Sequence, residues 1–374
     1  MHLMAYLDDC RERVRTELKA MLPADSARTG GLYELMLKYP LRYGKALRPA
    51  LSIAVCRARG GSLPAILPTA AVLELYHNAF LVHDDIEDQS ELRRSEPTLH
   101  REYGLPIAVN VGDGMLALAI QPLLDNIECV GLGKALKILQ IVSRMARETA
   151  EGQMIELDWV RSGDWTHADL EYVRLVYKKS AWYSFVAPIL AGAVAAGLPD
   201  SEVKKLGRMA IPLGIAFQIQ DDILNLCAAR DSYGKDHCGD LWEGKHTLIL
   251  IHALRAAKPE SRRKAVGILR KPHPTAEQRN GKVLHNGSGG SAANGGGSMS
   301  RDKEIPETSK SEDVVGFLRA LIDECGSIHY ARTMALKYAR RFERDLQLAS
   351  KAWTQSIHKD FLHDLADFTI DRNH

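Results

Sequence analysis

Two apolar segments of this chain each end in a cluster of aspartates. The first reads LVHDDIEDQSELRR from Leu81 to Arg94, and the second reads FQIQDDILNL from Phe217. If both segments are helical, carboxylates four residues apart lie on one face of their helix. The first aspartates of the two clusters, Asp84 and Asp221, are 137 positions apart (221 minus 84). The clusters therefore come from different helices, and a helical bundle can bring them face to face.

Both clusters present oxygen atoms, which indicates a hard cation. Like charges four residues apart destabilise a helix by about 0.2 to 0.5 kcal/mol per pair, so we expect a cation between them. Without Cys or His at ligand spacing, Mg2+ or Mn2+ is favoured over zinc. A solvated acidic face is the better interpretation of a single cluster, but two clusters after apolar segments favour a metal site. Its expected ligands are Asp84, Asp85, Asp88, Asp221, Asp222 and Asn225.

Helical patterns dominate the rest of the chain. They run through residues 134–159, 166–196 and 203–226, and no alternating run of Val, Ile and Thr indicates a sheet. A chain of 374 residues with 45% hydrophobic content can bury a sizeable core. The sequence therefore predicts an all-α protein, in which Gly192 and Gly214 permit close packing of helices.

Basic residues gather in two further motifs. Lys45 and Arg48 in RYGKALRP are three residues apart at the start of an apolar helix, where the positive helix end suits a phosphate. For this pair alone, two ordinary surface cations are the simpler interpretation. Lys235 and Lys245 follow the second cluster in the Gly-rich segment GKDHCGDLWEGK. Cations so close to carboxylates indicate that the ligand is a metal-bound polyphosphate.

Charge and cysteine content exclude some functions and compartments. The formal net charge of +2, from 49 basic and 47 acidic residues, gives no electrostatic reason to expect nucleic acid or an anionic membrane as a partner. Six scattered cysteines without CxxC pairing are typical of reduced thiols in the cytoplasm. The amino terminus lacks the apolar core of a signal peptide, and no run of about 18 uncharged apolar residues follows, so we expect neither secretion nor a transmembrane segment.

One segment departs from the globular pattern. Residues 273–310 are rich in Gly, Ser, Asn and Pro and have almost no large apolar side chains. This composition predicts a flexible surface insertion, because such a segment buries too little apolar area to offset the entropy of ordering. A binding or regulatory segment is the alternative to a tolerated loop.

Taken together, the motifs resemble those of one family. The motifs GKALRP, LVHDDIEDQSELRR, KKSAWYSF, FQIQDDILN, GDLWEGK, GSIHYA and LADFTIDR are similar to those of the trans-isoprenyl diphosphate synthases (polyprenyl synthetases), most of all the geranylgeranyl diphosphate synthases of the eukaryotic kind. The resemblance implies a single domain over residues 1–374, interrupted by the insertion. Its fold would be an all-α isoprenoid synthase-type bundle around a deep central cavity, usually in a homodimer. Ser95 departs from the family, which usually has Gly there.

The resemblance also implies a reaction and a cofactor. The family joins an allylic diphosphate (dimethylallyl, geranyl or farnesyl) to isopentenyl diphosphate. The expected metal ligands named above would hold about three Mg2+ on the allylic diphosphate, and Mn2+ could substitute. Other matched residues would serve as the cations that grip this diphosphate, namely Arg93, Lys179 and Lys235.

Further roles follow from the same resemblance. Isopentenyl diphosphate binds without metal and so needs direct cations. The residues that match this second site are Lys45, Arg48, His77 and Arg94. Ser180 and Gln218 match positions where the family places polar oxygens near the developing carbocation.

Three other functions stay open. A farnesyl diphosphate synthase of the same family differs in product length. A class I terpene cyclase also ionises an allylic diphosphate, but it needs no second diphosphate site, so the four residues matched to that site argue against it. A non-catalytic partner subunit should have lost one metal cluster, and both clusters are intact in this sequence.

The residues before Asp84 suggest a limit on product length. If the growing chain runs along this helix, Phe80 and Tyr76 lie about one and two turns below Asp84, at depths of roughly 6 and 12 Å. Farnesyl-forming relatives commonly place aromatics at both the fourth and the fifth position before the first aspartate, and the fifth position here is Ala79. The resemblance therefore favours a twenty-carbon product. The alternative is that Phe80 merely packs between helices and the limit lies elsewhere.

Overall fold

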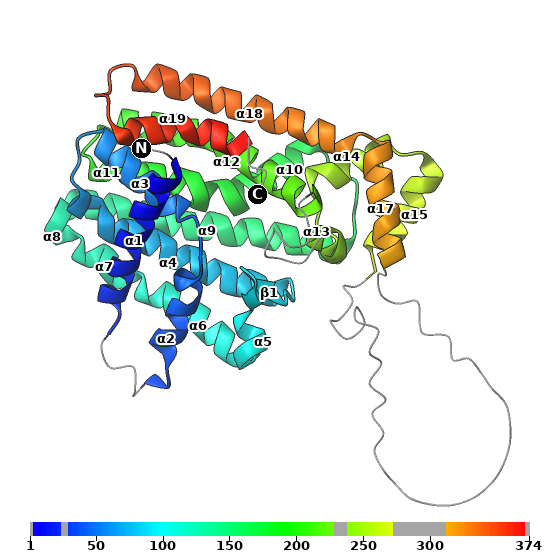
Figure 1. Cartoon of the computed structure of the whole chain (residues 1–374), viewed down its shortest axis with the longest axis horizontal. Helices are drawn as coiled ribbons and strands as arrows, with labels where there is room; N and C mark the ends of the chain where they lie inside the picture. Colours follow the sequence, from blue (N-terminus) through cyan, green and yellow to red (C-terminus); the bar gives the residue numbers. More distant parts are fainter. Residues whose placement is uncertain (1–2, 24–28, 228–237, 272–311, 371–374) are drawn as a thin grey trace, which may run out of the picture.

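The computed structural model of the protein describes residues 3–23, 29–227, 238–271 and 312–370. These residues form a helical bundle with one short ribbon, β1 (Leu92–Arg93) and β2 (Glu96–Pro97) (Figure 1). The helices of the first half are α1 (Leu3–Met21), α2 (Leu32–Leu41), α3 (Leu47–Ala58), α4 (Leu63–Glu87), α5 (Leu99–Tyr103), α6 (Leu105–Leu118), α7 (Ile120–Asp125), α8 (Ile127–Val130) and α9 (Leu132–Ser162). Those of the second half are α10 (Asp169–Val176), the π-helix η2 (Tyr177–Val186), α11 (Ala187–Ala195), α12 (Asp200–Cys227), α13 (Gly239–Glu243), α14 (Leu248–Ala256), α15 (Pro259–Leu269), α17 (Glu312–Glu324), α18 (Ser327–Ser350) and α19 (Ile357–Ile370). The predicted all-α class is confirmed.

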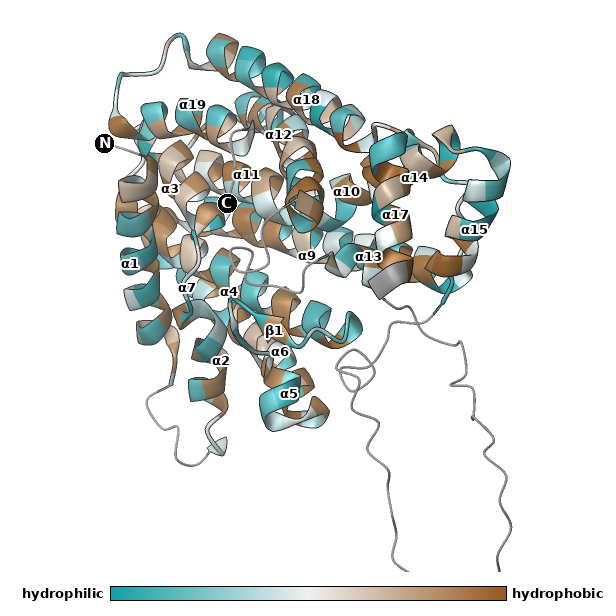
Figure 2. Cartoon of the chain, turned by 45° about the vertical axis from the view of Figure 1, so that its right-hand side comes forward, coloured by the Kyte–Doolittle hydropathy of each residue, from teal (hydrophilic) through white to brown (hydrophobic). Residues whose placement is uncertain are grey.

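Helix α4 carries the first acidic cluster. Its start is set by Ser62, whose hydroxyl accepts a hydrogen bond from the N–H of Ala65 at 3.4 Å, and by Pro64 in the first turn. Its apolar residues are buried among neighbouring helices, and in Figure 2 hydrophobic residues gather on the faces that helices turn toward one another. The helix ends at Glu87, so the cluster occupies its last turn and the residue that follows.

The segment predicted as one helix over residues 166–196 is divided into three. Helix α10 runs into η2, where the backbone adopts the wider π-helical form, and α11 follows. Pro188 lies in the first turn of α11 and has no N–H to donate to the preceding turn. Single π-helical turns are frequent at functional sites, and η2 contains Lys179 and Ser180.

The predicted packing role of two glycines is confirmed. A Cβ on Gly192 in α11 would lie 2.4 Å from the carbonyl oxygen of Ser52 in α3. A Cβ on Gly214 in α12 would lie 2.5 Å from the Cβ of Ala181 in η2. Both distances are shorter than van der Waals contact allows, so glycine lets these helix pairs approach closely.

The ribbon turns through Arg94 and Ser95, which both have positive φ angles, 55° and 63°. Two such residues between short antiparallel strands are typical of a type I′ turn, for which glycine is preferred at the second position. Ser95 is therefore held in a conformation that costs an ordinary residue about 1 to 2 kcal/mol. The turn carries Arg94 back toward α2, where its side chain reaches the end of that helix.

Two stretches are long and apolar enough to cross a membrane by length and composition, Leu63–Glu87 and Leu105–Val130. From the sequence we predict no transmembrane segment, because that prediction requires a run of uncharged apolar residues, whereas a helix that crosses a membrane tolerates one or two charged residues. The apolar window of Leu63–Glu87 is 78% buried inside the protein, as expected of a core helix, and that of Leu105–Val130 is 33% buried. Core helices pass the same composition test, so this is weak evidence for a membrane span.

Candidate active site

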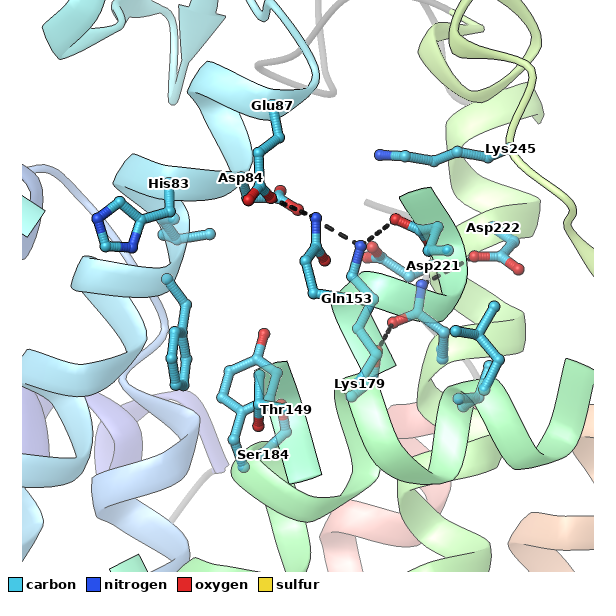
Figure 3. A pocket seen from close by; sticks show the side chains of 18 of the residues that line it. His83, Asp84, Glu87, Thr149, Gln153, Lys179, Ser184, Asp221, Asp222 and Lys245 are labelled. Atoms are coloured by element: carbon cyan, nitrogen blue, oxygen red, sulfur yellow. Dashed lines mark hydrogen bonds and ion pairs between the residues drawn. The ribbon is translucent and has the colours of Figure 1, made fainter. Parts of the chain in front are cut away.

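A cavity of about 640 Å³ opens between α4, α9, η2 and α12. Asp84 projects into it from the end of α4, and Asp221 and Asp222 project into it from α12 on the other side (Figure 3). The cations Lys179 and Lys245 also line its wall. The fold thus brings the two acidic clusters to one cavity, although they are far apart in the sequence.

Asp85 does not line this cavity. Its side chain is fully buried, and the hydroxyl of Tyr39 donates to its Oδ2 at 2.7 Å. Arg93 Nε donates to its Oδ1 at 2.8 Å. Because both carboxylate oxygens are engaged, this geometry argues against the predicted direct metal contact of Asp85. Its role here is to hold Arg93, whose Nη2 lies 3.5 Å from Asp84 Oδ2.

Asp88 is paired with a lysine across the cavity. Lys245 Nζ lies 2.6 Å from Asp88 Oδ2 and 2.7 Å from Glu243 Oε2. Burial and the neighbouring Glu243 raise the pKa of Asp88 above its ordinary value, against the effect of Lys245. Burial opposes the charge of Lys245, but Asp88 and Glu243 outweigh it and raise the pKa of this lysine. Lys245 therefore stays charged and occupies the position of a cation beside Asp88.

Lys179 plays the corresponding part for Asp84. Its Nζ lies 3.4 Å from Asp84 Oδ1 and forms an ion pair with Glu156. Burial opposes its charge, and Glu156 and Asp84 raise its pKa in spite of that burial. Figure 3 shows Lys179 extending between Asp84 and the second cluster. A single ammonium thus stands close to one carboxylate from α4 and one from α9.

The second cluster is held by a chain of hydrogen bonds. Tyr172 Oη donates to Asp222 Oδ2 at 2.6 Å, and Gln218 Nε2 donates to Asp222 Oδ1 at 2.8 Å. Ser180 Oγ donates to Gln218 Oε1 at 2.7 Å. Burial raises the pKa of Asp222 to about 7, while the bonds from Tyr172 and Gln218 lower it and the charge of Asp221 raises it. Gln218 is therefore bonded directly to the second acidic cluster, and Ser180 is bonded to it through Gln218.

Asn225 also lies on the cavity wall, one turn beyond Asp221. Its Oδ1 accepts a hydrogen bond from the backbone N–H of Asp240 at 3.2 Å. This bond ties the end of α12 to α13 and turns the amide toward the segment that carries Lys245. The side-chain oxygen of Asn225 is thus partly engaged by the protein itself.

Three of the four residues matched to a second diphosphate site line the cavity, namely Arg48, His77 and Arg94. Arg48 Nη2 donates to Ser184 Oγ at 2.8 Å, and its guanidinium lies 4.4 Å from the ring centre of Tyr183. The ring of His77 stacks on Tyr183 at 5.9 Å. Arg48 and His77 therefore share one aromatic neighbour, Tyr183.

Arg94 is anchored beside a glycine. Its Nη1 donates to the carbonyl oxygen of Tyr39 at 3.0 Å, and its guanidinium occupies the space where a Cβ of Gly44 would be. Lys45 is not among the residues that line the cavity, and its Nζ lies 5.1 Å from the ring centre of Phe368 in α19. The prediction that Lys45 binds ligand would thus require this side chain to move.

The residues predicted to limit chain length divide between wall and core. Phe80 lines the cavity. Ala79 is fully buried and is not among the residues that line the cavity. Tyr76 packs against Phe80 at 5.9 Å between ring centres. Tyr183 also lines the cavity, and its ring meets Phe80 edge-on at 5.6 Å.

Some site residues were missed by the sequence, and two predictions lie outside the described residues. Lys235 and the insertion over residues 273–310 belong to the undescribed part of the chain. Tyr39, Tyr172 and Glu156 contact predicted site residues but carry no motif of their own. Tyr172 could have been found, because it lies seven residues, about two turns, before Lys179 on one helical face.

The oxygen donors on the two walls fit a hard divalent cation. Asp84, Asp221, Asp222 and Asn225 present carboxylate and amide oxygens, and the ammonium of Lys179 already stands among them. Within the described residues, no three His, Cys, Asp or Glu side chains converge on one metal position. Metal binding there would therefore need carboxylates from both helices, together with oxygens from the ligand itself.

Comparison with known proteins gives consistent matches. Residues 31–285 match the polyprenyl synthetase family. A geranylgeranyl diphosphate synthase of Methanosarcina mazei is 28% identical over 378 aligned positions, covering 100% of both chains. A short chain isoprenyl diphosphate synthase of Methanocaldococcus jannaschii is 32% identical over 270 positions, 71% of this chain and 78% of the relative. The crystal structure of a geranylgeranyl pyrophosphate synthetase from Pyrococcus horikoshii superposes with a TM-score of 0.78 at 27% identity, covering 99% and 98% of the two chains.

These three relatives are archaeal, so the special likeness to eukaryotic members stays a prediction.

The contact between Gly44 and Arg94 predicts a binding defect. A Cβ on Gly44 would come within 2.8 Å of the Arg94 guanidinium, so Gly44→Ala should displace this cation. We expect the affinity for inorganic pyrophosphate, measured by calorimetry, to fall about tenfold, the size of one charge-assisted hydrogen bond. Gly267→Ala is the control, because a Cβ there meets nothing within 4 Å. Unchanged affinity in a folded Gly44→Ala protein would contradict this role of Arg94.

Proposed function

Because this chain belongs to the polyprenyl synthetase family, we propose that it condenses isopentenyl diphosphate with an allylic diphosphate to give geranylgeranyl diphosphate. It is a prenyltransferase, and its reaction is the elongation of a prenyl chain. The observation that carries the proposal is that one cavity is lined by aspartates of both acidic clusters and also by Arg48, His77 and Arg94. A metal-bound diphosphate and a second, metal-free diphosphate each find a suitable surface there.

In this reaction the allylic carbon–oxygen bond breaks and the bonding electrons leave with the diphosphate. The double bond of isopentenyl diphosphate then attacks the allylic carbon, and a proton is lost from the adduct to the departing diphosphate. Arg93 and Lys179 stand where the leaving charge develops. Ser180 and Gln218, which are bonded to each other beside Asp222, are the polar groups proposed to lie near the developing cation.

The cofactor proposed for this site is Mg2+, with Mn2+ as a substitute and about three ions per site. The ions would be held by Asp84 and Asp88 on one side and by Asp221, Asp222 and Asn225 on the other, and their chemistry would be to neutralise the leaving diphosphate. Lys245 must release Asp88 for this arrangement. The ammonium so released can turn to the diphosphate, because Glu243 keeps it at the cavity.

The choice of a twenty-carbon product rests on two supports. Two relatives that cover 100% and 92% of this chain are named geranylgeranyl diphosphate synthase and geranylgeranyl pyrophosphate synthase. The wall below Asp84 carries Phe80 and Tyr183, whose rings meet edge-on and close the cavity on that side. A farnesyl diphosphate synthase is the alternative within the family. A terpene cyclase is disfavoured by the second group of cations, and a non-catalytic subunit by the intact acidic clusters.

A homodimer is proposed from an apolar surface. Leu105 on α6 and Ile120 on α7 are 54% and 50% exposed and lie within the stretch Leu105–Val130, whose apolar window is only 33% buried. Leu132, the first residue of α9, is 59% exposed. Exposed apolar side chains of this kind are costly in water and are typical of an interface. We propose that a second copy of the chain covers this face, so that both apolar stretches, Leu63–Glu87 and Leu105–Val130, lie inside the dimer. The cytoplasmic location stays a prediction, and a dimer of this kind is compatible with it.

The dimer is tested by changing that face. Leu132→Glu together with Ile120→Glu should convert the protein to a monomer, because two charges per copy would be buried at the interface. Sedimentation velocity measures the mass, and a Leu348→Glu variant, at a 56% exposed position on α18, is the control. A wild-type chain that sediments as a monomer at micromolar concentration would refute the proposal.

The function is tested with labelled isopentenyl diphosphate and each allylic primer, followed by chromatography of the dephosphorylated products. We expect product only with Mg2+ or Mn2+. Asp84→Ala should reduce turnover by at least about a hundredfold, because the leaving charge loses a ligand of its counter-ion. Removing one of several repelling carboxylates should not unfold the helix. Asp200→Ala, at an exposed ion pair, is the control, and near-normal turnover of a folded Asp84→Ala protein would remove the metal assignment.

The product limit is tested at the wall. Phe80→Ala should lengthen the product by at least one five-carbon unit, because it opens the side of the cavity that the ring closes. Phe80→Leu keeps most of the bulk and should change the distribution little. Chromatographic chain length is the measurement. If Phe80→Ala keeps the wild-type distribution, the limit lies on another wall.

A further inference from the structure

Each acidic cluster contains one aspartate that is bonded by a buried tyrosine from a neighbouring helix. In the first cluster Tyr39 donates to Asp85, and in the second Tyr172 donates to Asp222. We infer that Tyr172 is a positioning residue, which fixes the Asp222 carboxylate for the metal and, through Asp222, the amide of Gln218 beside the reacting carbon. This inference rests on the proposed function of the cavity.

The two tyrosines bond to aspartates in different surroundings, and only Tyr172 bonds to an aspartate that lines the cavity. Asp85 lies outside the cavity, and its remaining oxygen is taken by Arg93, so Tyr39 supports a cation. Asp222 lines the cavity and has no cation bonded to it in the described structure. Its orientation is set by two donors, the hydroxyl of Tyr172 and the amide of Gln218. Losing the hydroxyl leaves the carboxylate held from one side only.

Tyr172 is itself held firmly in place. Its side chain is 2% exposed, and it belongs to α10, whose first turn is closed by a hydrogen bond from the N–H of Ala168 to Glu171 Oε2 at 2.8 Å. Asp169 in the same turn accepts from Arg255 Nη1 at 3.0 Å, which ties α10 to α14. The hydroxyl therefore reaches Asp222 from a helix that is fixed at its start, and it defines where Oδ2 lies.

The effect of Tyr172 extends one bond further, to the amide of Gln218. Asp222 accepts from Gln218 Nε2, so the amide oxygen must point the other way, where it accepts from Ser180 Oγ at 2.7 Å. Tyr172 and Gln218 donate to Asp222, and Ser180 donates to Gln218. The orientation of the Asp222 carboxylate therefore determines the direction of each of these hydrogen bonds. A carboxylate that turned would release this amide as well.

Metal binding measured without turnover tests the role of Tyr172. The probe is Mn2+ titrated into the full chain in the presence of inorganic pyrophosphate, with free Mn2+ followed by electron paramagnetic resonance. Tyr172→Phe should weaken Mn2+ binding by roughly tenfold or more, the usual effect of removing an outer partner of a metal ligand. Tyr338→Phe, at a half-buried tyrosine of α18 away from the cavity, is the matched control and should bind as wild type.

A coupled variant separates positioning from general destabilisation. In an Asp222→Asn background, Tyr172→Phe should cause no further loss of Mn2+ affinity, whereas a structural defect would add to it. Equal Mn2+ affinity of wild type and Tyr172→Phe, or full additivity of the two changes, would overturn the inference. These results do not depend on product formation, so a wild-type chain that binds Mn2+ but makes no prenyl product would refute the proposed function alone.

Discussion

Repulsion between buried carboxylates is the constraint on which the site depends. Asp84 from α4 and Asp221 and Asp222 from α12 line one cavity, and Asp88, just after α4, contacts Lys245 of its wall. Burial raises the pKa of Asp88 and of Asp222. Such groups must be compensated by cations or they take up protons. Lys179 and Lys245 are those cations in this structure, each within ion-pair distance of one cluster aspartate.

Each lysine is also bonded to a glutamate that belongs to neither cluster. Glu156 holds Lys179 and Glu243 holds Lys245. When an aspartate turns from its lysine to another cation, the lysine keeps its ion pair with the glutamate. The charge of the ammonium is therefore still balanced by one carboxylate. The two glutamates therefore hold both ammonium groups at the site whether or not the aspartates are engaged, so each ammonium remains available to a diphosphate.

Close helix packing is what places these groups. A Cβ on Gly152 in α9 would lie 2.3 Å from the backbone nitrogen of Lys179, so α9 and η2 touch at the residue that carries this cation. Gly214 does the same for α12 against η2, one turn before Gln218. The three segments that form one side of the cavity are thus joined at backbone distance, which leaves their polar side chains little freedom.

The sequence by itself determined the helical class, the two oxygen-rich clusters and the cations that accompany them. Helical periodicity and the chemistry of a motif both depend on residues that are close together in the sequence. It could not determine which of two adjacent aspartates faces the cavity. Asp84 and Asp85 look alike in the sequence, and only the packing of α2 against α4 brings the hydroxyl of Tyr39 to Asp85 and turns it away from the cavity. For the same reason Phe80 lines the cavity while the adjacent Ala79 is buried, and Tyr183 from η2 stands beside Phe80. These contacts join residues 46 positions apart (Tyr39 and Asp85) and 103 positions apart (Phe80 and Tyr183, 183 minus 80), so the tertiary structure alone decided them.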